Sequence, residues 1–421
     1  MNRGLNPGLN PGLNHGLCGA IGEAVDAGHG AQVEFLGELV KMASDNPPGD
    51  CAPHAERAAE LLEGLGFAVE RHAVAPAEAR ENGLVSTTNL IVRRRFGEGP
   101  VVALNAHGDV VPPGAGWTVD PYGAEVRDGH MYGRGVAVSK SDFATYAFAL
   151  LALERAKADL AGTVELHFTH DEESGGALGP KAILEKGLSK PDFAICAGFG
   201  YGVVTAHNGC LHLEVEVRGR QAHAASPDAG ADALEAATRV LSELYAHRRS
   251  YGAIRSSVEG IDSPTLVVGL IEGGINTNVV PDRVTLRLDR RLIPEEDAGA
   301  VEADLGEIIA AAAAGCVGIE TTVRRVLLAE PLTPLPGSER LAALLAHHGA
   351  AVLGCEIRSH GVPLYTDARH YAGAGIPVVI YGAGPRDSHQ ANAHGADERL
   401  RLSDLRDATE VVARTLAELL A

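Results

Sequence analysis

A short apolar segment that ends in a histidine and an aspartate places the strongest constraint on this chain. The run from Val101 to Leu104 follows Gly99-Pro100 and has the length and composition of a buried β-strand. It continues into Asn105-Ala106-His107-Gly108-Asp109-Val110-Val111-Pro112, so an imidazole stands at the carboxyl end of the strand. Histidine is the commonest metal ligand, and a metal-bound histidine usually donates its second N–H to a carboxylate. This segment alone fits either a metal-binding His107 oriented by Asp109 or a surface histidine followed by a turn.

A second strand with a polar end follows later in the chain. Residues 164–168 alternate between apolar and polar side chains and lead into Thr169-His170-Asp171-Glu172-Glu173-Ser174-Gly175-Gly176. Apolar helical segments such as 143–156 separate the predicted strands, and this alternation favours an α/β fold. Ligands of such folds bind at the carboxyl ends of the strands. Glu172 and Glu173 are therefore the second candidate for a catalytic site.

The order of the predicted elements indicates a small domain inserted within a larger one. Composition changes around residues 198–202, and a β-α-β-β-α-β order follows over 211–326, typical of an antiparallel sheet with two helices. Long helices and buried strands return from about residue 328. The predicted domains are an α/β catalytic domain and its insertion: 31–200 with 327–421, and 201–326.

Two local predictions concern the amino-terminal part of the chain. Residues 1–17 contain a repeat of Gly-Leu-Asn-Pro, whose turn signals predict that no helix or strand runs through it. Residues 1–30 are accordingly predicted to form an arm that is disordered or docked against a partner subunit, with the first helix over about 32–43. Strands over 89–92 and 101–104 are predicted to be antiparallel neighbours around a charged turn.

Charge and composition exclude several classes of partner. The formal net charge of −19 argues against nucleic acid or an anionic membrane surface. No apolar run approaches the roughly 20 residues that span a bilayer, and the amino terminus has no apolar secretory segment. The six cysteines are scattered without a Cys-x-x-Cys pair, which favours reduced thiols and a cytoplasmic location.

Nine blocks, in the right order, together resemble one family, the co-catalytic zinc metallohydrolases that include aminoacylase, carboxypeptidase G, acetylornithine deacetylase and succinyl-diaminopimelate desuccinylase. The resemblance covers nearly all of residues 32–421. It implies a zinc-peptidase α/β catalytic domain with an inserted ferredoxin-like lid domain, which usually dimerises. The matching blocks are 105–112, 117–122, 132–140, 169–176, 219–227, 273–282, 289–294, 366–369 and 388–389.

The resemblance implies a role for each matching residue. His107, Glu173 and His389 match metal ligands, Asp109 matches the carboxylate that orients the first ligand, and Glu172 matches the general base. In the lid, His223 matches the histidine that reaches an active site, often across the dimer. Asn278 matches the lid asparagine of the motif Gly-x-x-x-Asn-Val-x-Pro and is predicted to bind the substrate. Arg291 and Arg369 match arginines that often face substrate anions. The structural alternatives are a lid-surface histidine at 223 and ordinary ion pairs for the two arginines.

Two positions depart from the family pattern. Val138 stands where an aspartate bridges two metals in the family, and Gly198 or its neighbour Ala197 stands where an acidic residue binds one of them. Without a bridge, two cations about 3.5–4 Å apart repel each other. The remaining His107, Glu173 and His389 make the ligand count of a mononuclear catalytic site. We therefore expect one divalent metal ion per chain, with Mn, Zn, Fe and Co all compatible with these ligands.

Two nearby residues are weighed as replacement ligands. Asp142 lies four residues after Val138, but a position in the first turn of a helix explains it better. Cys196 is a soft donor, but a buried structural cysteine is the better explanation.

The expected reaction is hydrolysis of a C–N bond outside a peptide chain, in a small substrate that carries a carboxylate. The metal lowers the pKa of a water molecule, and Glu172 accepts its proton. The resemblance implies an N-acyl amino acid or dipeptide amidohydrolase, working as a homodimer through the lid. One alternative is an aryl aminohydrolase of the kind that deaminates 5-nitroanthranilate, since a single metal suits a more activated electrophile. The other alternative is a catalytically inactive binding or scaffold homologue.

Overall fold

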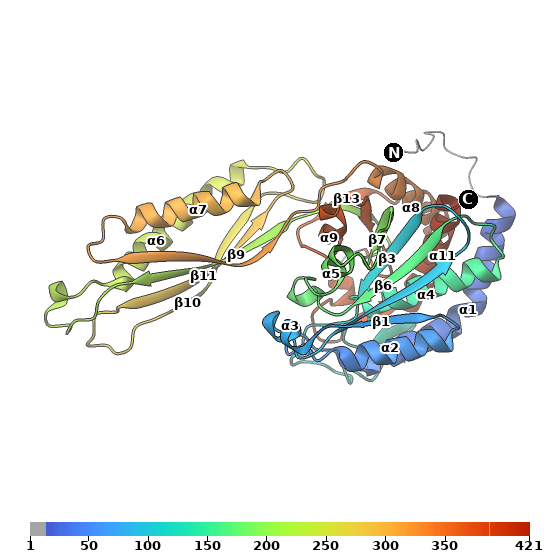
Figure 1. Ribbon diagram of the computed structural model, residues 1–421, viewed down its shortest axis with the longest axis horizontal. Coiled ribbons are helices and arrows are strands. Elements are labelled where there is room, and N and C mark those ends of the chain that lie inside the picture. Colours follow the sequence, from blue (N-terminus) through green and yellow to red (C-terminus); the bar gives the residue numbers. More distant parts are fainter. Residues whose placement is uncertain (1–13, 387) are drawn as a thin grey trace. The chain divides into compact units, whose positions relative to one another are not determined.

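The computed structural model describes residues 14–386 and 388–421, and their contacts divide the chain into two compact units (Figure 1). The first unit contains the described residues up to Thr205, together with 334–359 and 370–421. The second unit contains 206–333 and 360–369. The predicted disorder at the start of the chain falls partly on residues 1–13, which lie outside the described residues.

An eight-stranded mixed sheet organises the first unit (Figure 1). Its four central strands, β6, β3, β7 and β14, run parallel, so that their carboxyl ends lie at one edge of the sheet. In sheet order the strands are β1 (Val69–Ala73), β2 (Thr88–Arg95), β6 (Thr163–Thr169), β3 (Val101–His107), β7 (Phe193–Cys196), β14 (Val378–Ile380), β8 (Val203–His207) and β13 (Ser359–Val362). A small separate sheet has the order β15 (Arg399–Arg401), β5 (His130–Tyr132) and β4 (Glu125–Arg127).

Helix α4 (Lys140–Arg155) packs on β3 and β6 and is buried along most of its length, between α1 (His15–Lys41) and α11 (Leu402–Leu419) (Figure 1). This explains why its sequence is apolar nearly all round.

Every helix that the structure describes is too short or too polar to span a membrane. The other helices of four or more residues in this part of the fold are α2 (Ala52–Gly64), α3 (Pro76–Glu81), α5 (Pro180–Glu185), α8 (Ser338–Leu353), α9 (Ala368–Gly373) and α10 (Ser388–Ala391).

Helix α1 begins far earlier than predicted, so the expectation of no helix within residues 1–17 is wrong from His15 onward. The Asn14 side chain accepts a hydrogen bond from the backbone N–H of Gly16 and caps the helix. Ile21 and Val25 are then buried at helical spacing and belong to the same core as Leu36. Residues 15–30 therefore form part of a helix that packs on the first unit, rather than a separate arm.

The predicted pairing of the strands over 89–92 and 101–104 is also wrong, because β6 lies between β2 and β3. Instead of closing a hairpin, the turn bonds to the start of β6: the Phe96 N–H donates to the Gly162 carbonyl, and Pro100 accepts from the Thr163 N–H. Gly162 permits this approach, since a Cβ there would lie 2.4 Å from the Pro100 carbonyl oxygen.

The second unit is a four-stranded antiparallel sheet covered on one face by two helices. The strand order β10-β11-β9-β12 is the ferredoxin-like order expected for the lid. Its elements are β9 (Gly209–Arg218), α6 (Ala233–Arg248), β10 (Thr265–Gly273), β11 (Arg283–Leu292), α7 (Ala298–Ala313) and β12 (Glu320–Ala329).

The second unit extends beyond the insertion that was predicted over 201–326. Leu332 exchanges two backbone hydrogen bonds with His207, which ties the chain after β12 to this unit. Val362 accepts a hydrogen bond from the Asn208 N–H, which ties in part of the segment 360–369. Contacts between residues so far apart in the sequence leave no local pattern to read.

We expect Glu165→Gln to destabilise the first unit at neutral pH. Burial raises the pKa of Glu165, but hydrogen bonds from His167 and Ser189 and the charge of Arg93 outweigh it and lower the pKa to about 2. A carboxylate whose pKa falls on folding stabilises the fold above its unfolded pKa, and this contribution disappears as the pH falls toward about 2. Urea titrations should show a loss on the order of 3 kcal/mol at pH 7 that shrinks below pH ~4. An equal loss at every pH would contradict this role.

Candidate metal centre

Three side chains converge at the carboxyl ends of β3 and β6. His107 is the last residue of β3 and lies opposite Thr169 on the parallel strand β6. Glu172 and Glu173 follow in a 3₁₀ turn over Glu172–Ser174. One potential ligand atom from each of His107, Glu172 and Glu173 lies within 4.8 Å of the other two. The two strand ends that the sequence singled out are therefore brought together.

The buried carboxylate of Asp109 holds this group in place. The His107 Nδ1–H donates to the Asp109 backbone carbonyl at 3.0 Å, which leaves Nε2 available for a ligand. Asp109 Oδ1 accepts from the backbone N–H of Glu172 at 3.2 Å, and Oδ2 accepts from that of Glu173 at 3.1 Å. Asn46 Nδ2 also donates to Oδ2, at 2.9 Å. Asp109 thus positions all three converging residues, and no sequence pattern indicated the contribution of Asn46.

The electrostatics of the group favour a cation. Burial lowers the pKa of His107, but the hydrogen bond to Asp109 and the charges of Glu172 and Glu173 raise it well above its usual value. Glu173 Oε1 is buried without a well-aligned hydrogen bond from any residue that the structure describes. Its nearest charged partner is His394 Nε2 at 3.3 Å, and the imidazole of His107 with two adjacent carboxylates is a donor set that a divalent metal ion accepts. The residues present therefore fit a divalent metal ion.

The carboxy-terminal histidines differ from expectation in their placement. His394, which the sequence did not single out, places Nε2 3.3 Å from Glu173 Oε1, and this contact raises the pKa of His394. His389 lies on α10, is exposed, and is not part of the group around His107. It lines a cavity of about 420 Å³ with Asn392, Ala393, Gly395 and Ala396. A second histidine five residues after His389 was the one available signal for His394.

Neither Val138 nor Gly198, the two positions that depart from the family pattern, supplies a side chain that can bind a metal ion. The backbone N–H of Val138 donates to Glu398 Oε1 at 3.2 Å, so the loop is held by Glu398. A Cβ on Gly198 would lie 2.4 Å from Ile380 Cγ2, which blocks a side chain there. Asp142 lies in the first turn of α4, as expected, and accepts backbone N–H groups of Gly198 and Ala383.

The predicted residues of the lid lie in the second unit and form two pairs. His223 Nδ1 accepts a hydrogen bond from the Ala225 N–H at 3.0 Å, so its proton sits on Nε2. Asn278 lies close to His223, because the backbone carbonyl of Asn278 accepts a hydrogen bond from the backbone N–H of Ala224. The guanidinium groups of Arg291 and Arg369 lie 5.9 and 5.5 Å from the centre of one ring, that of Tyr365.

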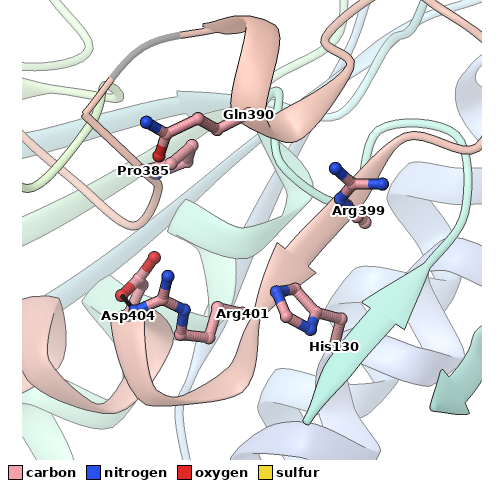
Figure 2. Close-up of a pocket in the computed structure, with 6 residues that line it drawn as sticks. All are labelled: His130, Pro385, Gln390, Arg399, Arg401 and Asp404. Atoms are coloured by element: carbon pink, nitrogen blue, oxygen red, sulfur yellow. Dashed lines mark ion pairs between the residues drawn. The ribbon is translucent and has the colours of Figure 1, made fainter. Parts of the chain in front are cut away.

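A further cavity of about 400 Å³ in the first unit contains none of the predicted site residues (Figure 2). Arg401 and Asp404 form a long ion pair of 3.9 Å at its wall. The cavity is lined by His130, Pro385, Gln390, Arg399, Arg401 and Asp404. Among the residues that the structure describes, its lining contributes to neither group of metal-type ligands, so the cavity is not the candidate centre.

We expect Asp109→Asn to weaken metal binding by about 10–100-fold, because the amide cannot accept hydrogen bonds at both positions. A competition titration with a chromophoric chelator measures this change. Asp228→Asn, at an exposed carboxylate of the second unit, is the matched control. Equal affinities in the two variants would show that Asp109 does not orient the ligands.

Comparisons with known proteins find similar sequences and folds. The sequence profile of Peptidase family M20/M25/M40 matches residues 103–418. A succinyl-diaminopimelate desuccinylase of Wolinella succinogenes is 28% identical over 399 residues, 92% of this chain and 98% of that protein. An acetylornithine deacetylase of Myxococcus xanthus is 31% identical over 389 residues, covering 91% and 96%. The crystal structure of the Bacillus subtilis YXEP protein, a dinuclear metal-binding peptidase of family M20, superimposes with a TM-score of 0.68 at 17% identity, covering 94% of this chain and 99% of that one.

Proposed function

The chain belongs to peptidase family M20/M25/M40, and from this premise we propose that it hydrolyses N-acyl amino acids or dipeptides with a single divalent metal ion. Membership of the family makes it a metal-dependent amidohydrolase. The names of two relatives, a desuccinylase and a deacetylase, support an acyl group on nitrogen as the part removed. The observation that carries the proposal is the convergence of His107, Glu172 and Glu173 around the buried Asp109.

His107 and Glu173 would hold the metal through Nε2 and a carboxylate oxygen. His389 is proposed as the third ligand on the strength of its motif, and His394, 3.3 Å from Glu173, is the alternative. A bound divalent ion supplies Lewis acidity and lowers the pKa of water. Glu172 accepts the proton of the attacking water and returns it to the leaving nitrogen. Of the two adjacent carboxylates, Glu172 is therefore proposed to transfer protons and Glu173 to bind the metal.

The residues of the second unit are proposed to bind the substrate. With its proton on Nε2, His223 can donate a hydrogen bond to the oxygen that becomes negative in the transition state. Asn278, beside it, supplies further polar contact. Arg291 and Arg369 are proposed to bind the substrate carboxylate through charge-assisted hydrogen bonds. Nε and Nη2 of Arg291 already face Asp289, so its Nη1 is the group proposed to reach the substrate.

A homodimer through the lid and a cytoplasmic location complete the proposal. Val267, Leu270 and Ile271 of the edge strand β10 are more than half exposed, at 51, 66 and 55%. An exposed apolar edge strand favours pairing with a second copy. All six cysteines are free, which suits a reducing compartment.

Val138 and the blocked position at Gly198 remove two family metal ligands, and a single metal suits a more activated electrophile. The second candidate reaction is therefore the removal of an amino group from an electron-poor ring. The experiment is a substrate panel of N-acetyl and N-succinyl amino acids, dipeptides and amino-substituted nitrobenzoates. We expect release of an amino acid from the N-acyl amino acids or the dipeptides. Release of ammonia from the nitrobenzoates alone would select the aminohydrolase, and no turnover with metal bound would select an inactive homologue.

A further inference from the structure

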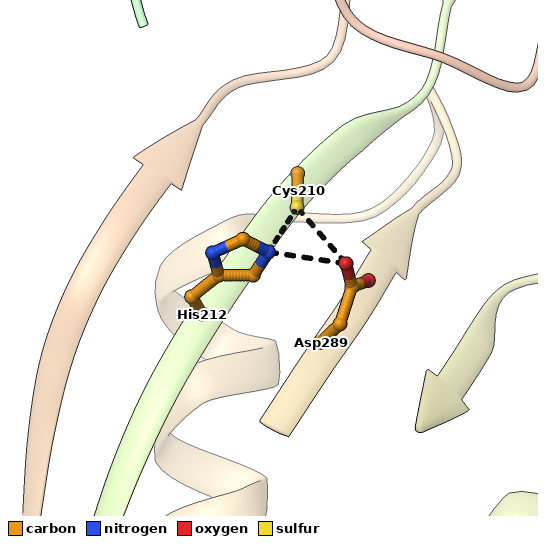
Figure 3. A group of neighbouring side chains, drawn as sticks. All are labelled: Cys210, His212 and Asp289. Carbon is orange, nitrogen blue, oxygen red and sulfur yellow. Dashed lines mark hydrogen bonds and ion pairs between the residues drawn. The ribbon is translucent and has the colours of Figure 1, made fainter. Parts of the chain in front are cut away.

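A second convergence of metal-type ligands lies in the second unit, on neighbouring strands. Cys210 and His212 are two residues apart on β9 and so share one face of the sheet, while Leu211 and Leu213 point to the core on the other. Asp289 on β11 lies directly opposite His212. His212 Nε2 is 3.2 Å from Cys210 Sγ and 3.0 Å from Asp289 Oδ2, and Sγ is 3.8 Å from Oδ2 (Figure 3).

The way these atoms meet is not that of a nucleophile relay. In a Cys-His-Asp relay, one ring nitrogen faces the thiol and the other faces the carboxylate. Here His212 Nε2 faces both Cys210 and Asp289. Three potential ligand atoms around one point are what a bound cation requires.

The spacing fits a tetrahedral ion. Zinc bonds of about 2.3 Å to sulfur and 2.0–2.2 Å to nitrogen and oxygen place tetrahedral ligand atoms about 3.3–3.6 Å apart. The observed separations of 3.0, 3.2 and 3.8 Å bracket these values, so small side-chain rotations suffice. The His212 and Asp289 side chains are 36 and 31% exposed, which leaves a way in for the ion and a place for water.

Arg291 limits the charge of this site. Its Nε lies 3.0 Å from Asp289 Oδ1 and its Nη2 lies 3.2 Å from Oδ2. A thiolate and a carboxylate together outweigh one guanidinium, so a divalent cation is favoured there. The ion can take Oδ2, the oxygen nearest His212 and Cys210, while Arg291 keeps Oδ1.

We propose that Cys210, His212 and Asp289 bind one zinc-class divalent cation, with water as the fourth ligand. Thiolate and imidazole are the ligands that favour Zn²⁺ over Mg²⁺ or Ca²⁺. The site shares no residue with the group around His107, but Asp289 contacts Arg291, which is proposed above to bind the substrate. The competing description is an ion pair, in which the hydrogen bonds that His212 donates to Asp289 and Cys210 raise the pKa of His212 to about 9.

Cobalt substitution of the full-length protein tests the proposal, because a cysteine-bound Co²⁺ shows a thiolate charge-transfer band. The proposed ligands around His107 include no cysteine, so the band reports on the second site alone. We expect the band in the wild type and in His107→Ala, and its loss in Cys210→Ser. Cys316→Ser, at another free cysteine of the second unit, is the matched control and should keep the band.

Elemental analysis gives the second readout. Zinc content should fall by about one ion per chain in Cys210→Ser and stay unchanged in Cys316→Ser. If circular dichroism shows that Cys210→Ser is unfolded, Cys210→Ala replaces it and should likewise lose the band. A wild type without the band, or a folded Cys210→Ser that keeps it, would overturn the proposal and leave an ion pair only.

Discussion

Replacing Glu172 with glutamine is expected to lower kcat by about 10²–10⁴-fold while the metal stays bound. The amide has nearly the shape of the carboxylate but cannot accept a proton from water. The turn should keep its structure, since the backbone N–H of Glu172, not its side chain, bonds to Asp109 Oδ1. Steady-state kinetics on the best substrate of the panel, at saturating metal, measures the change.

Glu185→Gln is the matched control for Glu172→Gln, because its carboxylate is 67% exposed on α5. It should leave kcat and KM unchanged. If Glu172→Gln kept kcat within about twofold of the wild type, Glu172 would not be the general base, and the proton would have to be accepted elsewhere.

The second large effect is expected from His107→Ala, which should remove both the metal and the activity. His107 stands at a strand end, with Nδ1 3.0 Å from the backbone carbonyl and 3.4 Å from the buried carboxylate of Asp109. Since a catalytic site with three protein ligands cannot spare one, we expect a background rate and no retained metal at this site. The count is made in a Cys210→Ser background, so that the second proposed site does not contribute.

In that background we expect about one tightly bound ion per chain before the His107→Ala change and close to none after it. His347→Ala, at an exposed histidine of α8, should leave the count unchanged. Two ions per chain in the Cys210→Ser background would contradict the single-metal proposal and would show that another group does the work of the missing bridge.

The parts of the fold and site that could be predicted are those set by local patterns. The apolar run Val101–Leu104 predicts a buried strand. The strands β3 and β6 are parallel neighbours, so their polar carboxyl ends lie at the same edge of the sheet. The family predicted from nine sequence blocks is confirmed by the profile match. The ferredoxin-like strand order was likewise predictable from the order of the elements.

The parts that could not be predicted depend on contacts between distant residues. Asn46 reaches Asp109 across 63 positions, and no local pattern marks an asparagine before two prolines as part of a site. His394 is placed near Glu173 by the path of a loop. The pairing of β2 with β3 was wrongly predicted for the same reason. Strands that are adjacent in the sequence favour a hairpin, and no local pattern indicates that β6 lies between them.

The crowded position at Gly198 has a consequence for any attempt to engineer a dinuclear ancestor-like enzyme. Restoring aspartate at Val138 would supply a bridge without a terminal carboxylate, and a glutamate at 198 would collide with Ile380 Cγ2. Valine keeps that methyl group, so Ile380 would have to become alanine, at a cost of about 2–5 kcal/mol for a buried isoleucine. Under the single-metal proposal, a path of single substitutions from this chain to a two-metal site therefore crosses a barrier of instability.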